Sequence, residues 1–343
     1  MDEPRLGLLG ATSLVGECLL PLLTKAGWQV TAFSRHAIEQ AGDGVEWRQS
    51  GAPARRGGAA GPDSTAGLHA AGLHANDRTQ QTITRWLCIA PIWVLPDYLD
   101  FLEASGARRI VALSSTSRFT KETSSDTAEQ ATARALAQAE DRLRRWAEDN
   151  GVEWVILRPT LIYGRGRDKN VCEIARFIRR FGFFPLFGPA HGLRQPVHAE
   201  DLAGACLAAV DAPAAVNRAY NLSGGETLCY RDMVSRIFVA MNRRPRLLKV
   251  PLGAFRMMLA VIRLLPRYRH WSVAMAERMN RDLLFDHADA VRDLRFAPRP
   301  FHLTAADIDP ARPTAGAADH DDGPCLKSRR SRAVARAGRR HES

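Results

Sequence analysis

The 343-residue chain lacks the long hydrophobic runs of a membrane protein. It contains no stretch of about 18 or more uncharged apolar residues, so we expect no membrane-spanning helix. Residues 252–265 come nearest, but Arg256 and Arg263 interrupt them. We expect an amphipathic helix there, with membrane contact as the alternative. The first four residues lack the basic and apolar regions of a signal peptide, which favours a cytoplasmic protein.

The six cysteines lack the close spacing of metal ligands or of a disulfide framework. Most of them stand in apolar periodic segments, where cysteine behaves as a small buried hydrophobic residue. They are Cys18, Cys88, Cys172, Cys206, Cys229 and Cys325. The pattern excludes a typical zinc site and fits a reducing compartment, so no bound metal is expected.

Acidic residues are scarce at the carboxyl end of the chain. The formal net charge is +11, and the residues after Leu326 carry seven Lys or Arg against one acid, Glu342, which gives 7 − 1 = +6. The remaining positive charge is spread over the preceding 326 residues. We therefore expect no specific nucleic-acid binding. The tail is expected to be a solvated end, with weak contact to anionic surfaces as the alternative.

What the chain does contain is a glycine-rich turn close to its beginning. An apolar strand is expected at residues 6–9, followed by Gly10-Ala11-Thr12-Ser13 and an amphipathic helix from Leu14. A strand, a tight turn and a helix present backbone N–H groups and a positive helix end to a phosphate. The sequence therefore predicts a dinucleotide site, with a plain strand–helix turn as the alternative.

Strands and helices alternate along most of the chain, which predicts a parallel α/β sheet with right-handed crossovers. Strands are expected at residues 6–9, 28–33, 45–47, 86–90, 109–113, 152–157 and 219–222. Helices are expected at residues 14–23, 97–105, 127–149, 172–180, 199–210, 230–241 and 256–294.

The expected elements divide the chain into three parts. Residues 1–165 form the dinucleotide-binding core, interrupted by a low-complexity loop at residues 51–76. Residues 166–310 form a smaller, mostly helical substrate lobe, from which residues 199–222 return to the sheet. Residues 311–343 are expected to be a disordered basic tail.

Arg35 follows the second expected strand, about twenty residues after the turn. An acidic residue at this place would bind both ribose hydroxyls and favour NAD, whereas an arginine pairs with the 2′-phosphate of NADP. Ser34 can add a hydrogen bond. The prediction is NADP, with NAD as the other option, and an ordinary exposed arginine is the structural alternative.

Five dispersed motifs, taken together, resemble the extended branch of the short-chain dehydrogenase/reductase superfamily, the NAD-dependent epimerase/dehydratase proteins. The motifs stand at residues 10–16, 113–116, 158–164, 194–203 and 293–298. The resemblance covers residues 6 to about 300. It implies a Rossmann-like doubly wound sheet with a C-terminal substrate lobe.

The resemblance also implies roles for particular residues. Thr116 matches the catalytic Ser/Thr that hydrogen-bonds the reacting oxygen, and Arg194 matches an arginine that clamps a substrate diphosphate. Tyr163 is a further catalytic candidate, and Arg292 a further substrate-binding candidate. The expected cofactor contacts are Gly10, Thr12, Ser13, Leu14, Val15, Gly16, Ser34, Arg35, Ala90, Pro91, Ser114, Pro159, Thr160 and Ile162.

One departure from the family concerns its proton-transfer pair, Tyr-x-x-x-Lys. Aligning the helix on Ala139-Glu140 places Thr132 at the tyrosine and Leu136 at the lysine. No tyrosine in the chain has a lysine four residues later. An aliphatic hydroxyl is a far weaker acid than a phenol, so the usual acid–base chemistry is not expected at this helix.

Two functions therefore remain open. The first is hydride transfer on a nucleotide sugar or a similar small substrate, with Thr116 polarising the substrate oxygen. The second is a non-catalytic NADP(H)-binding sensor or assembly protein that kept the fold. A homodimer formed through helices beside the core is compatible with either function.

Overall fold

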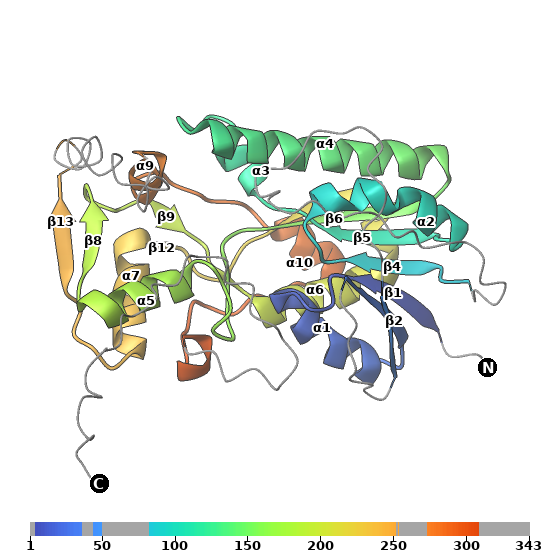
Figure 1. The fold of residues 1–343 in the computed structure, drawn as a ribbon, viewed down its shortest axis with the longest axis horizontal. Coiled ribbons are helices and arrows are strands. Elements are labelled where there is room, and N and C mark those ends of the chain that lie inside the picture. Colours follow the sequence, from blue (N-terminus) through green and yellow to red (C-terminus); the bar gives the residue numbers. More distant parts are fainter. Residues whose placement is uncertain (1–3, 36–43, 50–81, 252, 254–272, 309–343) are drawn as a thin grey trace, which may run out of the picture. The chain divides into compact units, whose positions relative to one another are not determined.

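The computed structural model describes residues 4–35, 44–49, 82–251, 253 and 273–308 (Figure 1). All of these residues belong to one compact unit, Met1–Ala311. The low-complexity segment at 51–76 and the second unit, Arg312–Ser343, lie outside the described residues, so the predicted loop and tail stay predictions.

A seven-stranded parallel sheet forms the centre of the unit, in the order β11-β6-β5-β4-β1-β2-β3. Its strands are β1 (Arg5–Leu9), β2 (Gln29–Ser34), β3 (Val45–Gln49), β4 (Arg85–Cys88), β5 (Arg109–Leu113), β6 (Glu153–Pro159) and β11 (Arg218–Leu222). From β1 the chain adds β2 and β3 outward along one half of the sheet. It then crosses back to add β4, β5, β6 and β11 along the other half, starting next to β1. This order confirms the predicted doubly wound, Rossmann-like fold.

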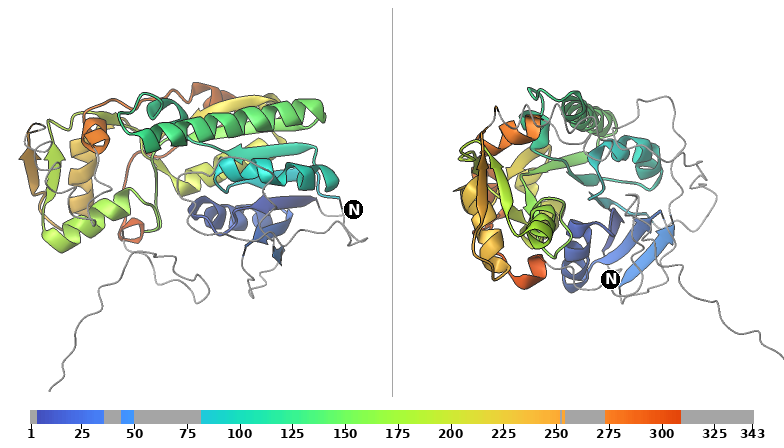
Figure 2. Two further views of the ribbon diagram at one scale, coloured as in Figure 1. Left: turned by 45° about the horizontal axis from the view of Figure 1, so that its top comes forward. Right: turned by 60° about the vertical axis from the view of Figure 1, so that its left-hand side comes forward.

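Helices cover both faces of the sheet (Figures 1 and 2). Val111 and Leu113 of β5 pack into the cluster that contains α1 (Leu14–Lys25) and α6 (Ala199–Asp211). Ile110 and Ala112 pack into the cluster on the other face, with α2 (Leu99–Ala104) and α4 (Thr127–Asp149). Successive side chains of a strand point to opposite faces, so a strand covered on both sides must be apolar throughout. The other covering elements are η1 (Ile92–Tyr98) and α10 (Ala288–Leu294).

A separate hydrophobic cluster forms the core of the C-terminal lobe, built around buried side chains such as Ile178, Leu186 and Phe238. Its main elements are α5 (Val171–Phe181), β8 (Phe184–Phe187), α7 (Tyr230–Ala240), β13 (Leu247–Val250) and α9 (Val273–Met279). Short strand pairs join its loops, namely β7 (Ile162–Tyr163) with β10 (Val197–His198), and β9 (Leu193–Arg194) with β12 (Leu228–Cys229). The sequence pattern did not predict these short strands, because two residues carry no detectable periodicity.

The predicted continuous helix at 256–294 is wrong in its second half. Residues 280–287 are not helical and separate α9 from α10. The Asn280 amide donates to Phe187 O at 2.7 Å and accepts from Ala190 N at 2.8 Å. Asp282 accepts from Leu193 N at 2.8 Å. Asn and Asp side chains that bond distant backbone groups stabilise a non-helical path. Residues 254–272 lie outside the described part of the chain.

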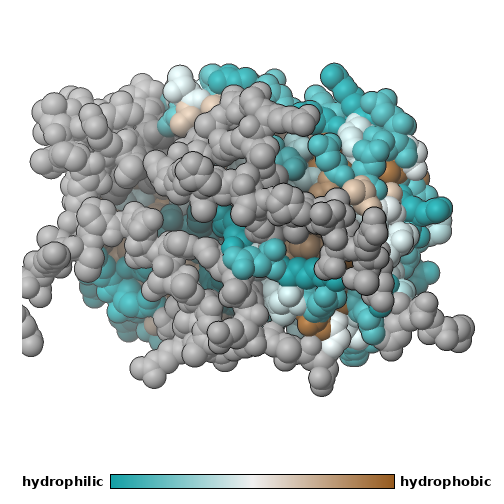
Figure 3. Space-filling view, turned by 45° about the vertical axis from the view of Figure 1, so that its right-hand side comes forward, coloured by the Kyte–Doolittle hydropathy of each residue, from teal (hydrophilic) through white to brown (hydrophobic). Residues whose placement is uncertain are grey.

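On the face shown in Figure 3, hydrophobic residues form small patches among hydrophilic ones. Among the described residues, Trp93, Phe181 and Val239 have exposed hydrophobic side chains. Scattered apolar side chains of this kind are ordinary on protein surfaces. Of the helices in the described ranges, none combines the length and the hydropathy needed to cross a bilayer.

Candidate functional site

The glycine-rich turn lies at the carboxyl end of β1, where the sheet order reverses between β1 and β4. Gly10 has φ +86°, and a Cβ built on it would lie 2.4 Å from Ala90 N. A Cβ on Gly16 would lie 2.4 Å from Gly10 O. Only glycine allows these close approaches of backbone to backbone. The turn therefore needs both glycines to form, whatever it binds.

Two backbone N–H groups at the start of α1 have no acceptor within the helix, those of Leu14 and Val15. The Gly16 N–H is already satisfied, because Ser13 Oγ accepts it at 3.1 Å and caps the helix. The free pair and the positive helix end fit a phosphate group. The exposed Thr12 side chain lies on the same turn. These residues therefore suit the pyrophosphate of a dinucleotide.

Ala90 and Pro91 follow β4 and lie beside the turn, since Ala90 N donates to Leu9 O at 3.3 Å. At the end of β2, Arg35 has an exposed side chain, and its carbonyl accepts from Gln49 Nε2 at 3.3 Å. Ser34 is half-buried. The structure thus brings three of the segments predicted to touch the cofactor to one edge of the sheet.

Thr116 stands at the same edge, after β5. It is 5% exposed, and its Oγ1 donates to Pro159 O at 3.1 Å, next to the end of β6. Thr160 Oγ1 donates to Gln195 O at 2.5 Å, and Ile162 lies in β7, which pairs with β10. The hydroxyls of Thr116 and Thr160 are therefore both engaged by backbone carbonyls.

Behind this edge lies a buried charged cluster that the sequence pattern did not reveal. Glu140 of α4 is fully buried, and its carboxylate accepts from Ser114 Oγ at 2.5 Å. Arg158 donates to it through Nε at 3.1 Å and through Nη2 at 2.6 Å, and Arg118 forms a further ion pair. The hydroxyl of Ser114, a predicted cofactor contact, is thus hydrogen-bonded to a buried carboxylate of the protein itself. Only the Ala139-Glu140 motif hinted at this site.

The positions aligned with the family's proton-transfer pair carry no acid–base group. Thr132 Oγ1 donates to Ala128 O at 2.9 Å, which is a bond within its own helix. Leu136 is 3% exposed and packs into the core beneath α4. This side of the site is therefore apolar and internally hydrogen-bonded.

Arg194 is buried and donates to backbone carbonyls of the lobe. Its Nη1 lies 2.7 Å from both Leu193 O and Arg281 O, and its Nη2 bonds Arg278 O. Its guanidinium also lies over the Tyr230 ring, and burial lowers its pKa to about 10. The diphosphate clamp predicted for Arg194 would have to use the donors that these contacts leave free.

Arg292 is exposed on α10, where it pairs with Asp289 and Asp293 of the same helix. Asp293 also accepts from Tyr220 OH of β11 at 2.9 Å. The contacts of Arg292 thus lie along the β11 edge, and none of them joins it to Arg194. Its role in substrate binding stays a prediction.

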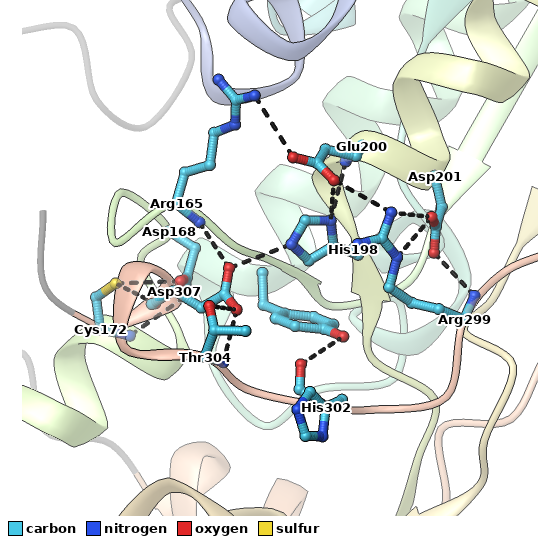
Figure 4. A network of polar contacts seen from close by, with 11 residues as sticks. Arg165, Asp168, Cys172, His198, Glu200, Asp201, Arg299, His302, Thr304 and Asp307 are labelled. Atoms are coloured by element: carbon cyan, nitrogen blue, oxygen red, sulfur yellow. Dashed lines mark hydrogen bonds and ion pairs between the residues drawn. The ribbon is translucent and has the colours of Figure 1, made fainter. Parts of the chain in front are cut away.

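Tyr163 is fully buried, and its ring contacts that of His198. Figure 4 shows the polar network in which His198 takes part with Asp307 and Glu200. Tyr163 donates through its hydroxyl to His302 O at 3.4 Å, and its ring meets the edges of His198 and Phe301. Burial raises the pKa of Tyr163 to about 12. A phenol with this pKa holds its proton firmly near neutral pH, so Tyr163 is a poor proton donor there.

Asp307 is the centre of that network. It contacts His198 Nε2 at 3.2 Å and accepts from Thr304 N at 2.9 Å and Arg165 N at 3.1 Å. Burial raises the pKa of the carboxyl, but these hydrogen bonds lower it by more, and the net pKa lies well below its usual range. The carboxylate therefore ties the end of the described chain to the loop after β7.

We expect Asp307→Asn to make the free energy of unfolding less dependent on pH in the acidic range. Because the folded-state pKa is depressed, the ionised carboxylate stabilises the fold above about pH 4, and this contribution is lost as the pH falls further. The gap between the urea midpoints of wild type and variant should stay constant from about pH 7 to 5 and narrow below. Asp286→Asn, on an exposed side chain, controls for the lost charge. A constant gap down to about pH 3 would contradict the expectation.

Within the described ranges, no group of His, Cys, Asp or Glu side chains has the arrangement of a metal site. The buried Cys172 thiol contacts Asp168 Oδ2 at 3.1 Å, and burial raises its pKa to about 12. The cysteines of this region therefore behave as packed, protonated side chains.

Comparison with known proteins adds a family to this geometry. The model of the NAD dependent epimerase/dehydratase family matches residues 7–223. The UDP-glucose 4-epimerase of Vibrio cholerae is 26% identical over 121 residues, which cover 35% of this chain and 37% of that protein. Subunit 9 of the NADH dehydrogenase [ubiquinone] 1 alpha subcomplex, from Arabidopsis thaliana mitochondria, is 28% identical over 100 residues, 29% of this chain and 25% of that protein.

The chain thus matches well under half the length of these two relatives. Among solved structures, the UDP-glucuronic acid 4-epimerase from Bacillus cereus in complex with NAD superimposes with a TM-score of 0.60 and 12% identity. The match covers 88% of this chain and 95% of that one. At this identity the likeness establishes the fold.

Proposed function

Because the chain belongs to the NAD dependent epimerase/dehydratase family, we propose that it binds a nicotinamide dinucleotide at the carboxyl end of β1. The observation that carries this proposal is the turn at residues 10–16, where the N–H groups of Leu14 and Val15 point out of the start of α1. In doubly wound sheets, ligands bind at the place where the strand order reverses. Here that place lies between β1 and β4.

NADP is the proposed form of the cofactor. The end of β2 carries Arg35, whose exposed guanidinium can reach a 2′-phosphate, and the two described residues that end this segment, Ser34 and Arg35, include no carboxylate for the ribose hydroxyls. Phosphate oxygens match the guanidinium fork, so the pairing is stronger than with a neutral hydroxyl. Ser34, beside it, supplies a second hydrogen-bonding group.

The proposed reaction is hydride transfer on a nucleotide sugar or a similar small substrate held by the C-terminal lobe. A bound nicotinamide supplies the hydride acceptor and donor. Thr116 turns its O–H from the Pro159 carbonyl to the substrate oxygen and polarises it, while water or another group moves the proton. Arg194 offers its remaining N–H donors to a diphosphate. The similarity to a UDP-glucose 4-epimerase and to a UDP-glucuronic acid 4-epimerase supports this substrate class.

A second candidate, a non-catalytic cofactor-binding sensor or assembly protein, is favoured by a specific observation. Thr132 and Leu136 replace the proton-transfer pair, and both side chains are committed to helix and core contacts. A protein with this arrangement can hold the cofactor without moving a proton. The respiratory-complex name of the plant relative is compatible with such a role.

Titration of the full-length protein with NADPH and NADH, followed by a turnover screen over nucleotide sugars, ketones and quinones, tests both candidates. Arg35→Ala should weaken NADPH binding by about tenfold and leave NADH binding unchanged, because it removes a charge-assisted pair. Thr116→Val should lower turnover by about 100-fold with cofactor binding intact, since it removes one donor to the reacting oxygen.

The outcomes separate the candidates. Cofactor binding without turnover of any substrate favours the second function. Failure of the wild-type protein to bind either dinucleotide contradicts the proposal as a whole. An unchanged NADPH preference in Arg35→Ala contradicts the choice of NADP alone.

A further inference from the structure

A guanidinium from a distant segment lies on the glycine-rich turn. Arg167, which follows β7 in the chain, forms an ion pair with Glu17 in the first turn of α1. Its Nη2 lies 3.5 Å from Thr12 O, on the turn itself. The tertiary structure thus brings a positive charge across 155 residues of sequence to Thr12 and across 150 residues to Glu17, which stand on either side of Leu14 and Val15 in the chain.

The backbone that carries Arg167 is fixed in an unusual conformation. Gly164, Arg165 and Gly166 have φ values of +127°, +53° and +64°. Arg165 is the only one of the three with a side chain, and its N–H is held by Asp307 Oδ1 at 3.1 Å. A non-glycine residue rarely adopts this region, and it persists where its surroundings enforce it. The loop therefore fixes the backbone that carries Arg167, while its side chain is 39% exposed, which leaves the guanidinium room to turn.

The negative charge of Glu17, the ion-pair partner of Arg167, is unfavourable beside a site that binds an anion. A carboxylate in the first turn of a helix is favourable by itself, because it offsets the positive helix end. A pyrophosphate on the same helix end would repel it. The guanidinium fork of Arg167 suits either acidic partner, since it pairs with carboxylate and phosphate alike.

We propose that Arg167 is an exchangeable clamp of the pyrophosphate site: without ligand it pairs with Glu17, and with a dinucleotide bound it donates to the pyrophosphate. This inference rests on the proposed cofactor site and adds a residue to it. Glu17 then acts as a competitor that weakens binding. Any added affinity depends on the pyrophosphate, so ADP-ribose must show the effect as well as NADPH.

The experiment measures the affinity of full-length protein for NADPH, NADH and ADP-ribose by calorimetry. Arg167→Gln should weaken binding of all three by about tenfold or more, because a charge-assisted bond to the pyrophosphate is lost. Glu17→Gln should strengthen binding several-fold, since it frees the guanidinium and removes a nearby negative charge. Arg165→Gln is the matched control, because its guanidinium lies in the same loop but pairs with Glu200, at 3.4 Å.

The sign of the Glu17 effect distinguishes this clamp from a structural ion pair. If the pair only held the loop in place, Arg167→Gln and Glu17→Gln would weaken binding alike, and the proposal would be wrong. Equal affinities of Arg167→Gln and Arg165→Gln for ADP-ribose would also overturn it. Should wild type bind none of the three ligands, the failure lies in the proposed function. Thermal melts check that each variant is folded. If Arg167→Gln does not fold, the direction of the affinity change in Glu17→Gln still decides between the clamp and a structural ion pair.

Discussion

Replacing Glu140 by alanine is expected to destabilise the protein by about 3–5 kcal/mol. The Glu140 carboxylate is fully buried between Arg118 and Arg158 and accepts from Ser114 Oγ. Its removal leaves two arginine charges with little access to water and no partner. Breaking a buried ion pair from one side is costly for this reason, although the intact pair itself adds little net stability.

Urea unfolding followed by circular dichroism measures this effect. Asp141→Ala is the matched control, because Asp141 is the neighbouring acid on α4 and pairs with Arg144 near the surface. A pair this exposed contributes about 0–1 kcal/mol. If Glu140→Ala and Asp141→Ala cost the same, the buried cluster does not have the role assigned to it. Replacing Arg118, Glu140 and Arg158 together by methionine should cost less than Glu140→Ala alone, because no unpaired charge remains.

Gly10→Ala is expected to destabilise the protein by about 2–5 kcal/mol. Two effects add at this position. The backbone has φ +86°, which costs an L-residue about 1–2 kcal/mol. The new Cβ would also lie 2.4 Å from Ala90 N, and overpacking of this kind costs about 1–3 kcal/mol. Since the backbone must shift to relieve the contact, NADPH affinity should fall as well, by about tenfold.

Gly27→Ala separates the two effects. Gly27 has φ +83°, nearly the same as Gly10, but a Cβ there would meet nothing within 4 Å. It should therefore cost only the backbone strain and leave cofactor affinity unchanged. The free energy of unfolding from urea titrations compares the two variants. If both variants lost the same free energy of unfolding, the close approach of the new Cβ to Ala90 would contribute nothing to the cost of Gly10→Ala.

The fold could be predicted where local pattern and tertiary structure agree. The helix predicted at 127–149 matches α4 because its apolar face repeats over six turns and its ends carry Asp126 and Asn150 as caps. The strand predicted at 109–113 matches β5 because every residue of it is buried. Predictions failed at 280–287, where helix-forming composition is overridden by the side-chain bonds of Asn280 and Asp282 to distant loops.

The candidate site divides in the same way. Gly10 and Gly16 could be assigned from sequence, because the backbone requirement at each is local to the turn. Ser114 shows the limit of such assignment. Its position in a motif pointed to the cofactor, while its hydroxyl bonds Glu140, which stands 26 residues further along the chain. No spacing rule reveals a bond whose partners meet only through packing.

By itself the sequence determined the alternation of strands and helices, the glycine-rich turn, and the lack of a tyrosine–lysine pair on the helix after Thr116. These features depend on residue type and on neighbours a few positions away. Only the tertiary structure decided that Arg118 and Arg158 enclose Glu140. It also decided that the buried Tyr163 hydroxyl bonds the His302 carbonyl and that Arg167 reaches the turn before α1. Such contacts join segments up to 155 residues apart, and their partners are selected by the packing of the sheet and lobe rather than by any local pattern.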